Sequence, residues 1–262
     1  MTSSLFDYQV ASRNLETTRL NLLKSGSSQR EITYFVENIG KVSNADELIA
    51  DQRLYRFALT AFGLDSQAYA KGMIKKVLDE GVAEPTSLAN RLSDQKYRQF
   101  ARAFAFAEVG DFNVNKPDFV AGVVDKYLSI TAETKAGEQN IATRLGLYFD
   151  RVAPNVTSWY GVLADKALRE VVRVAAGLPK QIDTLNPDRL VDLYEKRFDL
   201  ADFKDPEKRD KLIQRFTLLY DIENGAPAAT SARVSLFQPL SSSSGPQIIT
   251  IDPATLKAGT FS

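Results

Sequence analysis

The chain has 262 residues, of which 44% are hydrophobic, and its 33 Lys and Arg balance 33 Asp and Glu. This balance leaves no global field that would attract nucleic acid or an acidic membrane surface. Because the sequence contains neither His nor Cys, disulfides, thiolate nucleophiles, zinc ribbons and His-dependent catalytic triads are excluded.

The first predicted element is an amphipathic helix within residues 1–27. Apolar residues and one threonine recur there three and four positions apart, on one helix face. They are Tyr8, Ala11, Leu15, Thr18 and Leu22. This face could pack against a partner with weak coiled-coil character, or against the chain's own domain, which is the simpler interpretation.

The second predicted helix begins at a capping box. Ser28 and Glu31 have the S-x-x-E spacing in which each side chain satisfies a backbone N–H of the other residue. An apolar face of helical period follows, and Gly40 is expected to end the helix. Residues 28–223 are predicted to form one helical domain.

Within this domain, one pattern occurs three times, in copies near 43–81, 86–130 and 157–200. The copies align on Asp51, Asp94 and Asp165, and each Asp is followed by apolar residues at the spacing of a helix face. A hydroxyl residue precedes each Asp by eight positions, namely Ser43, Thr86 and Thr157. The pattern predicts a short helix capped by the hydroxyl, a longer helix capped by the Asp, and a second helix after it.

The second helices are expected around "MIKKVL" from Met73, "VVDKYL" from Val123 and "LYEKRF" from Leu193. Pro at the first helical position marks two of these starts, after Lys116 and Asn186. A further helix, from Ile141 to Val152, is inserted before the third copy, so the copies are unequally spaced. We therefore predict an all-α protein built as an irregular array of helical units, not an open solenoid.

The composition changes over residues 224–262, where Pro, Gly, Ser and Ala replace the charged helical pattern. Such a tail is expected to lack a core of its own. Its "QIITI" segment is the one strand-like stretch.

Carboxylates are the only acid–base groups left for catalysis near neutral pH. Asp79 with Glu80 and Glu195 with Asp199 are candidate pairs, but Lys and Arg surround them, which is typical of solvated helix faces. The aromatic residues Phe100, Phe104 and Phe106 and the single Trp159 lie in helical register, which favours a core over a stacking surface. We expect no catalytic residue, no metal site and no cofactor.

The stretch "REITYFVENIGKVSNADELIADQRLYRFALTAFGLD" and the later "LSDQKYRQFARAFAF" and "ADKALREVVRVAAGL" resemble an uncharacterised alphaproteobacterial family, a domain of unknown function. The resemblance covers about Ser28 to Tyr220. Genes of this family are often found among flagellar genes, so the resemblance implies a helical protein connected with flagellar assembly or function. It supplies no catalytic residues.

The sequence thus predicts a non-enzymatic helical interaction protein with a protein partner, such as a flagellar component, and no nucleic-acid partner. The alternatives are a carboxylate-dependent hydrolase acting on cell-wall glycan and a helical regulator that binds a small ligand. No apolar stretch approaches the roughly 20 residues that span a bilayer, and the first residues lack a secretory signal pattern. We expect a cytoplasmic protein, associated with the flagellar apparatus or exported through it.

Overall fold

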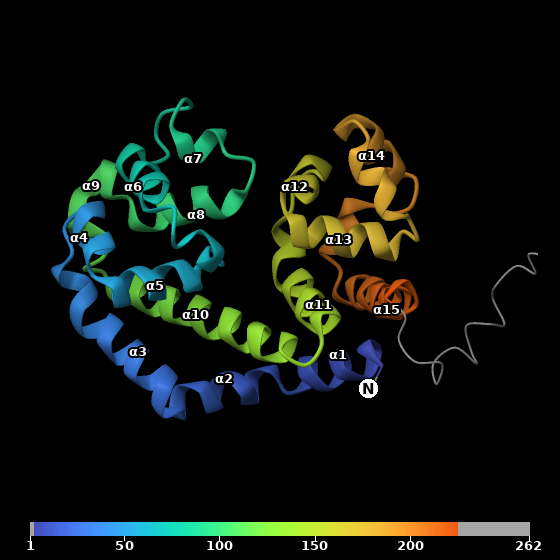
Figure 1. Cartoon of the computed structure of the whole chain (residues 1–262), viewed down its shortest axis with the longest axis horizontal. Coiled ribbons are helices and arrows are strands. Elements are labelled where there is room, and N and C mark those ends of the chain that lie inside the picture. The colour runs from blue at the N-terminus through green and yellow to red at the C-terminus, as the bar shows by residue number, and fades with distance from the viewer. Residues whose placement is uncertain (1–2, 225–262) are drawn as a thin grey trace, which may run out of the picture. The chain divides into compact units, whose positions relative to one another are not determined.

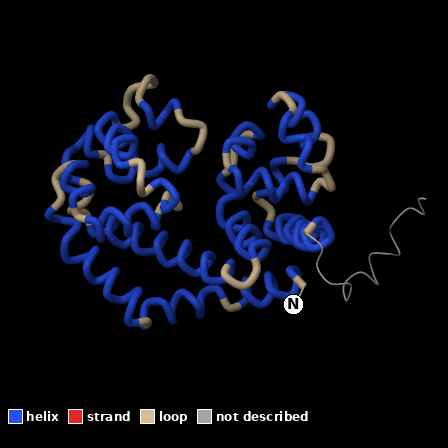
Figure 2. The backbone as a smooth tube through the Cα atoms, viewed as in Figure 1, coloured by secondary structure: helices blue, strands red, loops and turns tan. Residues whose placement is uncertain are grey.

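A computed structural model describes residues 3–224, and every regular element in that range is a helix (Figures 1 and 2). These residues contain no strand, which confirms the all-α prediction. They belong to one compact unit, residues 1–225. The predicted tail, with its "QIITI" segment, lies outside the described residues.

One hydrophobic core, the N-terminal core, is built around buried phenylalanines. Phe35 and Phe57 stack with ring centroids 4.4 Å apart, and Phe100 and Phe104 lie 4.9 Å apart. Phe106 is also buried, so the three aromatics expected in the core are confirmed there. The helices of this core are α3 (Gly26–Asn38), α4 (Ala45–Ala50), α5 (Gln52–Ala61), α6 (Lys71–Glu80), α7 (Leu88–Arg91), α8 (Gln95–Phe104), α9 (Phe106–Val109) and α10 (Pro117–Gly137).

A second cluster, the C-terminal core, surrounds Trp159. Its ring lies 5.9 Å from that of Tyr194 and 5.6 Å from that of Phe203, so the prediction that it is a core residue is confirmed. The helices of this core are α11 (Ile141–Val152), α12 (Trp159–Ala164), α13 (Lys166–Ala175), α14 (Pro187–Glu195) and α15 (Pro206–Glu223). The insertion predicted from Ile141 to Val152 is therefore a helix, as expected.

Short 3-10 helices connect several of these elements. They are η1 (Ile39–Lys41), η2 (Asp65–Gln67), η3 (Gly110–Phe112), η4 (Ala153–Asn155), η5 (Lys180–Thr184) and η6 (Leu200–Phe203).

The three predicted aspartate caps are confirmed. Asp51, Asp94 and Asp165 each precede a helix of ten residues, and each side chain accepts from backbone N–H groups of the first turn. These N–H groups have no partner within the helix, which is why a side-chain oxygen there stabilises the helix start. Pro117 and Pro187 also stand at helix starts, as expected. Whether the three segments arose by duplication stays a prediction.

The caps predicted for the short helices are wrong by one position. The N-cap residues are Asn44, Ser87 and Ser158. They replace the expected Ser43, Thr86 and Thr157. A cap must be the extended residue directly before the first turn, and Asn44 takes this role by accepting from the N–H of Glu47 at 3.0 Å. Ser43 instead donates its backbone N–H to the Glu47 carboxylate at 2.7 Å, so the residue before the cap is also bonded to the first turn.

The N-terminal segment differs from the single predicted helix. The structure has two helices, α1 (Ser4–Arg13) and α2 (Leu15–Lys24), separated at Asn14. The Asn14 side chain donates to the carbonyl of Val10 at 2.9 Å, and such local bonds compete with helix continuation. Tyr8 is buried in the C-terminal core and Leu22 in a smaller cluster with α10, so the predicted face packs on the chain's own body.

The capping box predicted at Ser28 is also wrong. Helix α3 begins at Gly26, because Ser25 is the extended residue before it, and Ser28 lies buried inside the helix. Gly40 lies in η1, two residues beyond the end of α3 at Asn38. In the third copy α14 ends at Glu195, so only the first half of "LYEKRF" is helical.

Each of the three aspartate-capped helices is followed by a residue with a positive φ, the left-handed backbone conformation. Gly63 and Gly177 have φ of 67° and 68°, as expected for glycine after a helix. The second copy has no glycine there and places Ala105 at φ 51°. A left-handed alanine is strained by about 1 kcal/mol, and Ala105 is the C-cap residue that directly follows α8.

Candidate functional site

A polar cleft of about 590 Å³ is lined by helices from both cores. Its side chains come from α8, α10 and α11, from the start of α13, and from the loop that includes Asn155 and Ser158. Charged groups of both signs line it, so it is the first place to look for chemistry or binding.

The centre of this cleft is a hydrogen-bonded pair, Tyr148 and Asp165. Asp165 Oδ1 accepts from the N–H groups of Ala167 and Leu168 at 2.8 and 3.1 Å, which is its capping role. The other oxygen, Oδ2, accepts from the Tyr148 hydroxyl. Burial, together with the adjacent Asp165 charge, raises the pKa of Tyr148 far above its usual range. The phenol therefore stays protonated and acts as a donor.

Two cations lie against the Tyr148 ring. Lys96 Nζ is 3.4 Å from Asp165 Oδ2 and 5.2 Å from the ring centroid. The Arg151 guanidinium is 5.3 Å from the same centroid and donates to Glu133 Oε2 at 3.0 Å. Both arrangements fit cation–π contacts, and Lys96 thereby connects α8 of the N-terminal core to α13 of the C-terminal core.

The carboxylates that line this cleft are already engaged. Asp165 accepts from two backbone N–H groups and one phenol, and Asp125 forms an ion pair with Arg19. General acid–base catalysis needs a carboxylate that can exchange a proton with a substrate. Both carboxylates already have partners, Asp165 in buried bonds and Asp125 in an exposed ion pair.

The candidate carboxylate pairs from the sequence lie elsewhere. Asp79 pairs with Lys75 at 2.7 Å, and Glu80 accepts from the N–H of Leu88 at 2.5 Å. Glu195 and Asp199 line a second depression of about 630 Å³. Asp199 there caps η6 by accepting from Ala201 N–H. The second pair comes from one stretch of chain, not from two elements that face each other as a glycosidase requires.

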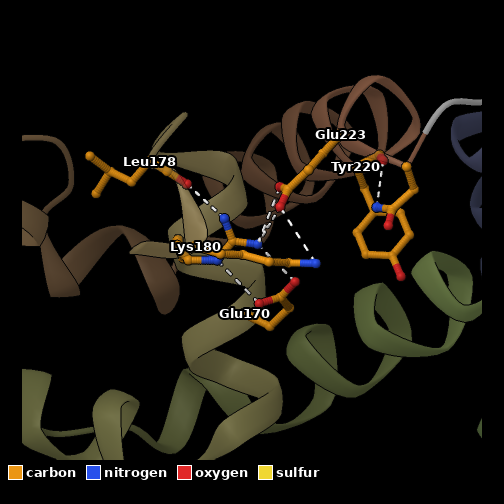
Figure 3. A network of polar contacts seen from close by, with 7 residues as sticks. Glu170, Leu178, Lys180, Tyr220 and Glu223 are labelled. Atoms are coloured by element: carbon orange, nitrogen blue, oxygen red, sulfur yellow. Dashed lines mark hydrogen bonds and ion pairs between the residues drawn. The ribbon is translucent and has the colours of Figure 1, made fainter. Parts of the chain in front are cut away.

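A buried arginine joins the ends of two helices in the C-terminal core (Figure 3). The Arg173 side chain is 0% exposed and donates to the Leu178 carbonyl at 2.7 Å. Its other nitrogens reach Glu170 at 2.9 Å and Glu223 at 3.0 Å, and Lys180 lies 3.7 Å from Glu223. A buried guanidinium needs such partners, so this network fixes the end of α13 against the end of α15.

A second tyrosine–aspartate pair repeats the arrangement of the cleft. Tyr34 donates to Asp51 Oδ2 at 2.7 Å, across the same separation of 17 residues that joins Tyr148 to Asp165. Burial opposes ionisation of Asp51, but the bonds from Tyr34 and from the N–H groups of Leu54 and Arg53 outweigh it and lower its pKa. The sequence analysis missed both tyrosines, although their equal spacing from the aligned aspartates was visible in the sequence.

Exposed apolar side chains concentrate on the two N-terminal helices. Phe6 and Leu20 are each 55% exposed, Val10 is 42% and Leu23 is 39% exposed. Single exposed apolar residues are common on proteins, but four of the large ones exposed among residues 3–224 lie on these two helices. The inward residues of the same helices, Tyr8 and Leu22, are buried.

Residues 3–224 contain no group of three or more Asp or Glu residues placed to hold a metal ion. Within the same range, no helix has the length and apolar character required to cross a bilayer.

Fold and cleft together define an all-α protein with two cores and a polar cleft whose two carboxylates both have partners within the chain. Residues 61–208 match the family model described as a protein of unknown function (DUF1217), and the chain belongs to this family. The chain is also similar to the crystal structure of protein AGR_C_984 from Agrobacterium tumefaciens, with 36% identity and a TM-score of 0.77. That similarity covers 86% of this chain and 97% of the Agrobacterium chain. No curated protein matches the chain.

The resemblance to an uncharacterised family is thereby confirmed, and the similar structure comes from an alphaproteobacterium. The flagellar connection stays a proposal.

Proposed function

We propose that this protein is a non-enzymatic helical interaction protein that serves the flagellum as an assembly factor, adaptor or minor structural component. The observation that carries the proposal is the set of exposed apolar side chains on α1 and α2: Phe6, Val10, Leu20 and Leu23. Surfaces of this kind mark contacts with other proteins. The partner we expect is a protein that presents an apolar helix face, because helices pair through such faces.

The engaged carboxylates of the cleft support the same conclusion. The hydrolase alternative requires two carboxylates that face one another and are available to a substrate. Asp165 and Asp125 are both held in structural bonds, so this cleft offers the hydrolase reading no support. The flagellar part of the proposal rests on the sequence resemblance alone.

The test is a pull-down from motile cells, followed by titration of each recovered flagellar protein in purified form. We expect the double variant Phe6→Ser/Leu20→Ser to weaken binding about a hundredfold or more, since each change removes roughly 1.5–3 kcal/mol of apolar burial from a complex. Tyr69→Ser is the matched control, because Tyr69 is 83% exposed and lies outside α1 and α2.

Equal affinity of the wild type and the double variant would refute the role of this surface. Normal swimming of a strain that lacks the protein would refute the flagellar assignment.

A further inference from the structure

The cationic side chains of the polar cleft are not all paired. Lys96 lies against Asp165 and Arg151 against Glu133. Arg98 and Lys126 also line the cleft, and neither has a carboxylate within 4.0 Å among residues 3–224. Two cations in this cleft are therefore available to an anion.

Arg98 also has a buried N–H group without an acceptor. One of its terminal nitrogens donates to the Asn90 carbonyl at 3.3 Å, but Nε is buried and has no hydrogen-bond partner. Buried donors in folded proteins almost always have a partner, and an orphaned one calls for a water or a ligand. A guanidinium is a planar donor that matches the two oxygens of a carboxylate or phosphate.

Helix α8 presents this arginine with polar neighbours. Its apolar residues, Tyr97, Phe100 and Phe104, are buried in the N-terminal core. Its other face contributes Gln95 and Gln99 to the cleft. Amide side chains that line the same cleft provide further donors for an anionic group.

We propose that this cleft binds an oxyanion, a carboxylate or phosphate group, held by Arg98 from α8 and Lys126 from α10. A free phosphorylated compound and an acidic segment of a protein carry the same chemistry, and both fit a cleft of about 590 Å³. The proposal goes beyond the interaction surface on α1 and α2, and either can fail without the other.

The test is calorimetric titration of the full-length protein with two probes, inorganic pyrophosphate and a hexaglutamate peptide. We expect saturable binding of at least one probe at a single site, weakened by added salt. Arg98→Gln and Lys126→Gln should each reduce the affinity about tenfold, since each removes one charge-assisted contact. Arg102→Gln is the control, because Arg102 is exposed on the same helix and does not line the cleft.

Each outcome decides the question. Binding of pyrophosphate alone assigns the cleft to a free phosphate compound, and binding of the peptide alone assigns it to an acidic protein segment. Failure of both probes to bind would overturn the proposal, as would an equal loss of affinity in Arg102→Gln and Arg98→Gln. Melting temperatures establish that each variant is folded, and the exposed Lys126 gives a second test if Arg98→Gln is unstable.

Discussion

The three aspartate caps offer a graded test of how the fold is stabilised. Each begins a helix of ten residues, but their bonds differ in number. Asp94 accepts from one backbone N–H, that of Lys96. Asp51 accepts from two and also from Tyr34 and is partly exposed, whereas Asp165 has the same set of bonds and is buried, at 8% exposure.

These differences predict the order of the losses on substitution by Ala. Asp94→Ala should cost about 1 kcal/mol, the usual value of a cap. Asp165→Ala should cost roughly 2–4 kcal/mol, because it removes the cap and leaves the buried Tyr148 hydroxyl without an acceptor, which adds about 1–3 kcal/mol. Asp51→Ala should fall between them, since its tyrosine partner lies nearer to solvent.

The assay is the denaturant midpoint of each variant, together with Asp→Ser at each position. Ser can cap a helix, so it should rescue Asp94 most and Asp165 least. The double variant Asp165→Ala/Tyr148→Phe should lose less than the sum of the single losses, because the unpaired hydroxyl is gone. Equal losses at the three positions, or additive losses in the double variant, would refute this reasoning.

Three further predictions concern other parts of the molecule. The pKa of Asp51 is lowered in the folded protein. Its ionised form therefore stabilises the fold above the unfolded pKa of about 3.9, and this contribution is lost as the pH falls through the lower folded pKa. Asp51→Asn should make the denaturant midpoint depend less on pH in this acid range. Gly146→Ala should lower the free energy of unfolding by about 1–3 kcal/mol through overpacking, because the added Cβ would lie 2.9 Å from Ile213. Gly122→Ala is the control: an added Cβ there has nothing within 4 Å, so this change should stabilise α10 and raise the melting temperature. Arg173→Met should lower the free energy of unfolding by roughly 1–3 kcal/mol, because the buried Leu178 carbonyl loses its donor, and Arg173→Lys should not restore it in chemical denaturation.

The helix starts were the most predictable part of the fold. A capping aspartate acts on its own first turn, so Asp51, Asp94 and Asp165 could be recognised from nearby residues alone. The short-helix caps were displaced by one residue, because Ser, Thr and Asn all cap and several stand side by side. The break at Asn14 was missed because the apolar period continues across it.

Contacts between distant parts of the chain were not predictable from one sequence. Arg173 lies in a helix whose apolar face was recognised, yet its burial depends on Glu223, which is 50 residues away. The polar cleft is likewise made by side chains from α8, α10 and α11, and no local pattern brings Arg98 and Lys126 to the same cleft. The Tyr34 and Tyr148 bonds are the exception, since their shared spacing could have been noticed.

The contact between the first and last described helices has a consequence for the order in which the fold is completed. The Ser4 N–H donates to Asp221 at 2.9 Å, across 217 residues, and Figure 1 shows α1 near α15. During synthesis, α1 leaves the ribosome long before α15 exists, so Tyr8 has to wait for much of its final packing surface. An early apolar helix of this kind is a natural site for chaperone binding in the nascent chain.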